Sequence, residues 1–172
     1  MDLYQTTPNV ISIDTACAIT EISKNTWWRR ISKGDFTRVT KEAHGRTMLL
    51  WSELAPHICI PISPEVKQFV LLADAGDADA QDDIGQLFLA AEKPKAAVYW
   101  FQQAAKRRHP DAMQWLGHCY INGKGVPKDE NLGIMWIANA AALGHVIAQG
   151  LIRFRFKGCL PTTTDLNEFE QI

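Results

Sequence analysis

The sequence predicts a mainly α-helical protein, in which an α-solenoid of stacked helix pairs follows a small N-terminal domain with a two-stranded hairpin. The first observation is an internal repeat, because residues 79–88 align with residues 111–120. The second is that the N-terminal part shows no such repetition and is locally basic. These observations divide the chain into residues 1–60, the helical stack at 61–160, and a polar cap or tail at 161–172.

Composition and charge place the chain among globular proteins. Its 172 residues are 47% hydrophobic and 22% charged, and the formal net charge is −1. This balance excludes a disordered chain and leaves no overall field that would draw the protein to nucleic acid or to a membrane. The charge is unevenly spread, since residues 20–50 hold seven Lys and Arg against three acidic residues, a local balance of +4. Residues 61–172 hold eleven basic and thirteen acidic residues.

Neither the cysteines nor the N-terminus indicates a metal centre, a disulfide framework or export. Cys17, Cys59, Cys119 and Cys159 are scattered without a short paired spacing, so we expect reduced thiols, no metal-ligand set and no cofactor. Residues 1–5 lack the basic start and apolar core of a signal peptide, and no apolar run approaches the length of a membrane span. We therefore expect a cytoplasmic protein without a membrane partner.

Each repeat is predicted to be a pair of helices joined by a loop. Residues 97–105 align with residues 133–141 at an offset of 36, whereas the segments that begin at 79 and 111 are offset by 32. The difference of four falls in the loop at 122–127, whose Gly and Pro residues end one helix and begin the next segment. Small residues that let the first helix approach its partner are Ala80, Gly85, Ala112 and Gly117. Residues at helical spacing that predict the buried contacts are Leu87, Phe88, Leu116, Tyr120, Trp100, Phe101 and Trp136.

These residues resemble the Sel1-like repeat family, a relative of the tetratricopeptide repeats. The likeness is carried by the Ala-x-x-x-Leu-Gly pattern at 112–117, followed by Tyr120, Gly123, Gly125, Val126, Asp129, Trp136, Ala140, Ala141 and Gly144. The second unit, 109–144, matches most completely, and the first, 77–108, lacks the Gly-x-Gly loop. Residues 69–76 and 148–158 are interpreted as half-units on either side. The resemblance implies an adaptor that binds another protein on a concave face lined by the first helices.

Helical periodicity selects the candidate contact residues on that face. We expect exposed, protein-binding side chains at Gln86, Gln114, His118, Arg153 and Arg155. The alternative interpretation is that most of them are ordinary solvated side chains, because their orientation is inferred from periodicity alone.

The N-terminal part is predicted to fold as a helix, a tight turn, a basic helix and a hairpin. A helix over 13–19 follows Ser12, and a second helix over 24–32 is capped by Ser23 and ends at Gly34. The remaining elements are an alternating strand over 36–40, a turn at 43–45, a strand over 46–50 and a short helix at 52–54. On the second helix, the inward positions are Trp27 and Ile31.

This order of elements resembles the winged helix-turn-helix of the excisionase and MerR-like DNA-binding domains. The carrying residues are the segment 22–27 with Arg29, Ile31 and Gly34, then Gly45 and Arg46 in the wing, and Glu53 and Leu54 after it. The resemblance implies that the second helix faces the major groove through Lys24, Asn25, Trp28 and Arg29. It implies phosphate contacts in or beside the wing from Arg38, Lys41 and Arg46. The local positive charge of this part suits both roles.

Two departures from that family keep a second interpretation open. Trp28 is a bulky apolar side chain on the outward face, which is more typical of a protein contact, and Arg30 stands where the family carries an aromatic core residue. The sequence therefore predicts a non-enzymatic regulatory adaptor whose repeats bind a protein and whose N-terminal domain binds double-stranded DNA. The alternative is a purely protein-binding adaptor of a signalling or secretion assembly.

Catalysis is not expected from the sequence. It contains no nucleophile elbow, no paired metal ligands and no complete phosphate-binding loop, and its histidines fall in repeat loops or at helix starts. A homodimer is a further alternative that the sequence leaves open.

Overall fold

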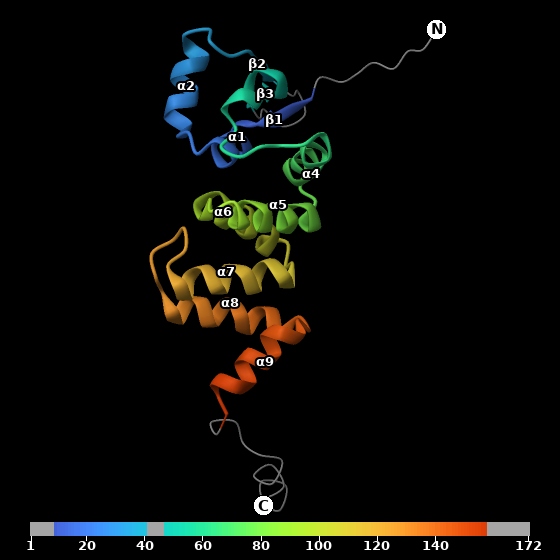
Figure 1. Ribbon diagram of the computed structural model, residues 1–172, viewed down its shortest axis with the longest axis vertical. Coiled ribbons are helices and arrows are strands. Elements are labelled where there is room, and N and C mark those ends of the chain that lie inside the picture. Colours follow the sequence, from blue (N-terminus) through green and yellow to red (C-terminus); the bar gives the residue numbers. More distant parts are fainter. Residues whose placement is uncertain (1–8, 41–46, 158–172) are drawn as a thin grey trace, which may run out of the picture.

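The computed structural model describes residues 9–40 and 47–157. The molecule is elongated, with a small mixed domain at one end, a column of helices in the middle and helix α9 at the other end (Figure 1). Within the described residues, none of the helices combines the length and the apolar character that a membrane crossing requires.

The N-terminal domain contains short helices packed beside a small sheet. Its elements in chain order are β1 (Val10–Ser12), α1 (Ile13–Thr20), α2 (Lys24–Ser32), β2 (Arg38–Thr40), β3 (Thr47–Leu50), α3 (Trp51–Leu54) and the 3₁₀ helix η1 (Ala55–His57). The predicted cap at Ser23 is confirmed, since its hydroxyl accepts a hydrogen bond from the Thr26 amide, and the Ser12 hydroxyl accepts one from the Thr15 amide in the same way. Helix α2 ends before Gly34, whose positive φ of 82° suits glycine.

The sheet contains the expected pair β2 and β3, but it also has a strand that the sequence did not reveal. The strand order is β1-β3-β2, and both pairs are antiparallel, with Ile11 opposite Leu49 and Val39 opposite Met48. The expectation of only two strands was therefore wrong. The additional strand, β1, spans three residues, too few for the alternation that identifies a strand in sequence. Its pairing is extended by a hydrogen bond of 2.8 Å from the Trp51 amide to the Asn9 carbonyl.

Trp27 anchors the core of this domain. Its side chain is fully buried, and the ring of Phe36 meets it edge-on with 4.9 Å between the ring centroids. Ile31 is half-buried one turn further along α2, whereas Lys24, Asn25, Trp28 and Ser32 are exposed. The predicted inward and outward faces of this helix are therefore confirmed.

The second part of the chain is a stack of helices, as predicted. The elements are α4 (Pro64–Ala75), α5 (Ala78–Ala90), α6 (Pro94–Lys106), α7 (Pro110–Asn122), α8 (Glu130–Ala142) and α9 (Val146–Arg155). Helices α5 and α6 form one pair and α7 and α8 the next, and the pairs lie one above the other (Figure 1). We call α5, α7 and α9 the first helices of the three units.

Glycines let the two helices of each pair cross closely. A Cβ atom on Gly85 would lie 2.6 Å from the Phe101 ring, and one on Gly117 would lie 2.8 Å from the Gly133 carbonyl oxygen. Real Cβ atoms do not approach other atoms so closely, so both positions require glycine, which confirms the role expected for these two residues.

The mixed domain and the stack share one continuous core. Asp74, near the end of α4, accepts hydrogen bonds from the Ser12 amide at 3.0 Å, the Ser12 hydroxyl at 2.5 Å and the Thr15 hydroxyl at 2.6 Å. A half-exposed ion pair of 3.0 Å between Lys93 and Glu21 adds a second link. The expected boundary near residue 60 is thus crossed by a dense polar contact.

Candidate partner-binding face of the repeats

The first helices present matching positions on one side of the stack, which we call the first-helix face. Positions four and seven residues apart lie on the same side of a helix, so each first helix contributes three such positions. The first-helix face consists of Asp79, Asp83 and Gln86 on α5, Asp111, Trp115 and His118 on α7, and Ile147, Leu151 and Phe154 on α9. None of the nine is buried. The face therefore changes from polar on α5 to apolar on α9.

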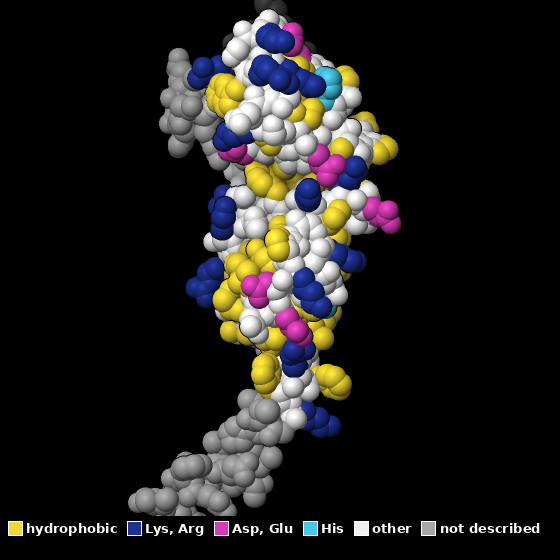
Figure 2. Space-filling view, turned by 90° about the vertical axis from the view of Figure 1, so that its left-hand side faces the viewer, with side chains coloured by type: hydrophobic (Ala, Val, Ile, Leu, Met, Phe, Trp, Pro, Cys, Tyr) yellow, Lys and Arg dark blue, Asp and Glu magenta, His cyan; other side chains and the backbone are white. Residues whose placement is uncertain are grey.

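The apolar end of this face is strongly exposed to solvent. Phe154 is 81% exposed and Ile147 is 64% exposed, and Val146 beside them is 78% exposed. Figure 2 shows hydrophobic side chains over the repeats and near the C-terminal helix, and a row of Lys and Arg side chains over the N-terminal domain. Apolar side chains clustered on a surface in this way are typical of binding sites for other proteins.

Two shallow hollows share His118 and Asn122 of α7, and the second of them borders the apolar side chains of α9. The first encloses about 340 Å³ and is lined by Leu89, Gln114, Trp115, His118, Cys119, Asn122 and Lys124. The second has a similar volume and is mainly apolar, lined by residues of α7, α8 and α9 that include Ile137, Leu151 and Phe154. Burial lowers the pKa of His118, which favours the neutral imidazole between the two hollows.

Trp115 is held in a fixed position between the hollow and the core. Its ring stacks on that of Phe101, with 6.2 Å between centroids and 11° between planes, and a tilted His118 ring lies 6.3 Å away. A rigid, half-exposed aromatic side chain of this kind is well suited to anchor a partner, because little conformational entropy is lost on binding.

Helix α9 departs from the repeat pattern at the glycine position. Arg153 occupies the position held by Gly85 and Gly117 in the other first helices. The close helix crossing that those glycines permit is therefore not available at Arg153.

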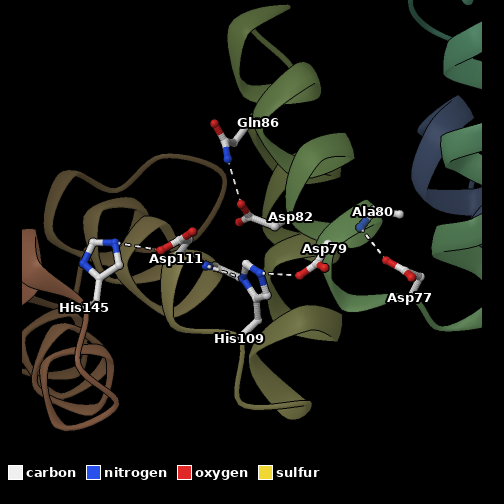
Figure 3. Close-up of polar contacts among 9 residues, drawn as sticks. Asp77, Asp79, Ala80, Asp82, Gln86, His109, Asp111 and His145 are labelled. Carbon is white, nitrogen blue, oxygen red and sulfur yellow. Dashed lines mark hydrogen bonds and ion pairs between the residues drawn. The ribbon is translucent and has the colours of Figure 1, made fainter.

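Histidines connect successive repeats at the start of the first helices. His109 and His145 each cap a helix, and their Nδ1 atoms accept hydrogen bonds from the amides of Ala112 and Ala148 at 3.2 and 3.1 Å. The Nε2 atom of His109 lies 3.0 Å from Asp79, and that of His145 lies 2.9 Å from Asp111 (Figure 3). Each histidine thus joins its own helix to the first helix of the preceding unit.

Asp82 lies next to these contacts and is buried. One carboxylate oxygen accepts a hydrogen bond of 2.7 Å from the Gln86 amide (Figure 3), and the other has no protein partner. Burial raises the pKa of Asp82, and the nearby Asp111 carboxylate acts in the same direction. Asp82, His109 and Asp111 place one potential ligand atom each within 4.8 Å of one another, a set that sequence spacing did not reveal.

The predicted contact residues of the repeats fall in different environments. Gln86 and Arg153 are exposed, His118 is half-buried, and Arg155 pairs with Glu130 at 2.6 Å. The expectation that Gln114 is exposed was wrong, since only 7% of it is accessible. Position 114 corresponds to the buried position 82 of the preceding unit, which faces neighbouring helices of the stack. Helical periodicity does not distinguish that side from the solvent side.

Sequence reasoning missed the apolar members of the first-helix face, namely Trp115, Ile147, Leu151 and Phe154. A position-by-position alignment of the three first helices would have identified them, because apolar residues replace Asp79, Asp83 and Gln86 at equivalent places. Patterns within a single helix do not carry this information.

The predicted DNA-binding residues of the N-terminal domain that the structure describes are exposed, and some of them contact other side chains of the protein. Lys24, Asn25, Trp28 and Arg29 are all exposed on α2. Lys24 forms an ion pair of 2.7 Å with Asp14. The guanidinium of Arg38 lies 5.7 Å from the centre of the Trp28 ring, so these residues of β2 and α2 are neighbours. Lys41 and Arg46 lie outside the described residues.

Comparison with known proteins identifies the repeats. The model of the Sel1 repeat matches residues 78–109 and 110–145. A curated relative, chitin synthase regulatory factor 4 of Schizosaccharomyces pombe, is 29% identical over 108 residues, which cover 58% of this chain and 17% of the relative. The chain thus spans about one sixth of the length of that relative.

Two solved structures are similar to part of the chain. A protective antigen present in uropathogenic Escherichia coli strains, which displays an SLR fold, has a TM-score of 0.51 and 33% identity over 56% of this chain and 22% of its own. A Sel1 repeat protein from Oxalobacter formigenes has a TM-score of 0.46 and 29% identity over 49% of this chain and 26% of its own. The predicted Sel1 repeats are confirmed by the family model and by the structure of the antigen.

Proposed function

We propose that this chain is a non-enzymatic cytoplasmic adaptor that binds a partner protein on the first-helix face, mainly through its apolar end. The observation that carries the proposal is the exposed apolar surface of α9 beside the hollow lined by His118, Leu151 and Phe154. Interface energy is usually concentrated in a few large side chains that fill such hollows. Proteins of Sel1 repeats are suited to this role because their stacked pairs leave an extended surface for binding.

The chemistry of the face indicates the kind of partner. An apolar side chain of the partner fits the hollow between α7, α8 and α9, while Asp79 and Asp83 at the polar end favour basic groups. The matched relative from Schizosaccharomyces pombe is named as a regulatory factor, which supports a role that acts through another protein rather than through catalysis.

Affinity purification of the full chain tests the proposal. We expect a variant with Leu151→Ser and Phe154→Ser to lose a specific set of co-purifying proteins that the unmodified chain captures, as quantified by mass spectrometry. The control variant carries Leu72→Ser and Met135→Ser, which are 50% and 44% exposed on α4 and α8, away from the first-helix face. If both variants capture the same proteins in the same amounts, the apolar end is not the binding site.

A second proposal concerns the N-terminal domain, which we infer to bind double-stranded DNA through α2. The exposed Asn25 and Arg29 on a Ser23-capped helix support this role, since both side chains make paired hydrogen bonds to base edges. Affinity for duplex DNA should fall steeply with salt concentration and should weaken in Arg29→Ala, whereas Lys106→Ala on α6 serves as a control of equal charge. If no duplex binding is detected at low salt, α2 is a protein-docking surface and the chain is a purely protein-binding adaptor.

A further inference from the structure

Three potential metal ligands from two successive repeats meet beside the first-helix face. Asp82 comes from the second turn of α5, His109 is the cap of α7, and Asp111 lies in the first turn of α7. One atom of each side chain lies within 4.8 Å of the others, a spacing that a single ion in their midst can satisfy. Asp82 and Gln86 lie on one side of the group, with His109 and Asp111 opposite (Figure 3).

The environment of Asp82 independently indicates a missing ligand. The residue is only 4% exposed, yet one of its two carboxylate oxygens has no hydrogen-bond partner in the protein. Buried polar atoms are almost always paired, and an exception calls for a bound ion or water. The Asp111 carboxylate lies close by, Gln86 donates only a neutral hydrogen bond to Asp82, and His109 is the neighbouring group that favours its negative charge. A cation would satisfy both the oxygen and the charge.

We propose that Asp82, His109 and Asp111 bind a divalent transition-metal ion, with one oxygen from each carboxylate and one ring nitrogen from His109. One nitrogen and two oxygens form a mixed ligand set that suits Zn²⁺ or a neighbouring transition metal better than Mg²⁺ or Ca²⁺, which prefer oxygen ligands alone. Three protein ligands leave further coordination positions for water or for a group of a bound partner.

To bind a metal, His109 must give up one of its present contacts within the protein, and water can replace that contact. His109 gives up either its hydrogen bond from the Ala112 amide or its contact with Asp79, whose side chain is 89% exposed and can turn into water. One carboxylate oxygen of Asp111 pairs with His145, so the second oxygen can bind a metal, and the side chain is 54% exposed. The buried Asp82 keeps its hydrogen bond from Gln86, because that bond is accepted by Oδ2, whereas the unpartnered oxygen is Oδ1.

The next repeat shows that this ligand set is not a general consequence of the stack geometry. In the alignment of the units, Asp82 corresponds to Gln114, His109 to His145 and Asp111 to Ile147. The second junction therefore keeps the histidine cap but has neither carboxylate. Stacking of repeats alone does not require an acidic residue at position 82, so its burial there points to a separate role.

Calorimetric titration of the metal-free full chain with ZnCl₂, and separately with MgCl₂, tests the proposal. We expect one saturable Zn²⁺ site, and at least about tenfold weaker Zn²⁺ binding in Asp82→Asn and in His109→Asn, both of which should remain folded. His109→Asn keeps an oxygen that can cap α7. The control is Asp35→Asn, which removes the same charge from an exposed position of the N-terminal domain, away from the site, and should leave the affinity unchanged.

Spectroscopy with Co²⁺ distinguishes this site from binding by cysteine. A set of nitrogen and oxygen ligands gives weak visible bands without the near-ultraviolet charge-transfer band of a thiolate ligand. The proposal is overturned if Zn²⁺ does not bind, if a thiolate band appears, or if Asp82→Asn binds as tightly as the control. These results concern a metal and leave the test of the partner-binding face unaffected.

Discussion

The imidazole of His109 lies 3.0 Å from the carboxylate of Asp79 while its other ring nitrogen caps α7. A single side chain thus satisfies a free helix amide and joins two repeats. His145 and Asp111 repeat the arrangement at the next junction, with a separation of 2.9 Å. At the start of α5, Asp77 only caps its own helix, with 2.8 Å between its carboxylate and the Ala80 amide. A short side chain caps as well as histidine does but does not reach the neighbouring unit.

Substitutions at His109 should separate its two roles. His109→Ala removes both the cap and the contact with Asp79, and we expect a loss of about 1–2 kcal/mol in the free energy of unfolding. His109→Asn retains a capping oxygen and should lose clearly less. Urea denaturation of both variants, and of each combined with Asp79→Asn, provides the measurement. If alanine and asparagine are equally destabilising, capping contributes little and the cross-repeat contact dominates.

Alanine at two glycines should have opposite effects on stability. Gly117→Ala places a Cβ 2.8 Å from the Gly133 carbonyl oxygen and 2.6 Å from Ile137, so the helices must move apart at a cost of about 1–3 kcal/mol. Gly150 lies in α9 with nothing within 4 Å of an added Cβ, so Gly150→Ala should stabilise the protein by about 0.5–1 kcal/mol. Thermal denaturation measures both. Similar shifts in the same direction would contradict the close crossing at Gly117.

The sequence was informative wherever a feature depends on near neighbours. The cap at Ser23 and the buried face of α2 around Trp27 follow from local patterns, and they were predicted correctly. The helix pairs were predicted because Gly85 and Gly117 recur in an alignable frame. Such features need only periodicity and turn chemistry.

Features that depend on distant parts of the chain were not predictable in the same way. The contact between His109 and Asp79 joins residues 30 positions apart, and no local rule connects them. Strand β1 is recognised only through its partner β3, and the burial of Gln114 depends on which neighbouring helix covers it. The candidate site combines both kinds of feature, so the sequence identified its helices but not its apolar end or its buried carboxylate.

Removal of Asp74 should weaken the junction between the mixed domain and the stack. Asp74→Ala leaves the hydroxyls of Ser12 and Thr15 without their shared partner, and we expect a loss of about 3 kcal/mol in the free energy of unfolding. Hydrogen exchange should show the largest loss of protection in β1 and α1. Asp83→Ala removes an exposed carboxylate as the control. Equal stability of the two variants would show that the apolar core alone holds the parts together.

The buried thiol of Cys119 should resist alkylation. Burial raises its pKa to about 11, so little of the thiol is ionised at mildly alkaline pH. Only 1% of the residue is exposed, so the alkylating reagent also has little access to the sulfur. Burial also raises the pKa of Cys17 and Cys59, but these are only partly buried. Peptide mapping after iodoacetamide treatment should find Cys17 and Cys59 modified first and Cys119 only after denaturation. Early modification of Cys119 would show that α7 opens readily.

In the metal-free protein, Asp82→Asn should increase stability at neutral pH. Burial raises the pKa of Asp82 in the folded state above its ordinary value of 3.8, so ionisation is less favourable in the folded than in the unfolded chain. The resulting destabilisation is complete above the folded-state pKa and vanishes as the pH falls below 3.8, where both states are protonated.

The neutral amide that Asp82→Asn introduces avoids this cost and still accepts the hydrogen bond from Gln86, so we expect a higher free energy of unfolding at neutral pH. The gain should shrink as the pH is lowered toward 3.8. Urea denaturation of both proteins across this range measures the difference, and effects of other titrating groups largely cancel in the comparison. A residue that destabilises the protein unless it holds a ligand is expected at a binding site, because stability alone would favour its replacement. If Asp82→Asn is neutral or destabilising without metal, the buried carboxylate is already compensated within the protein.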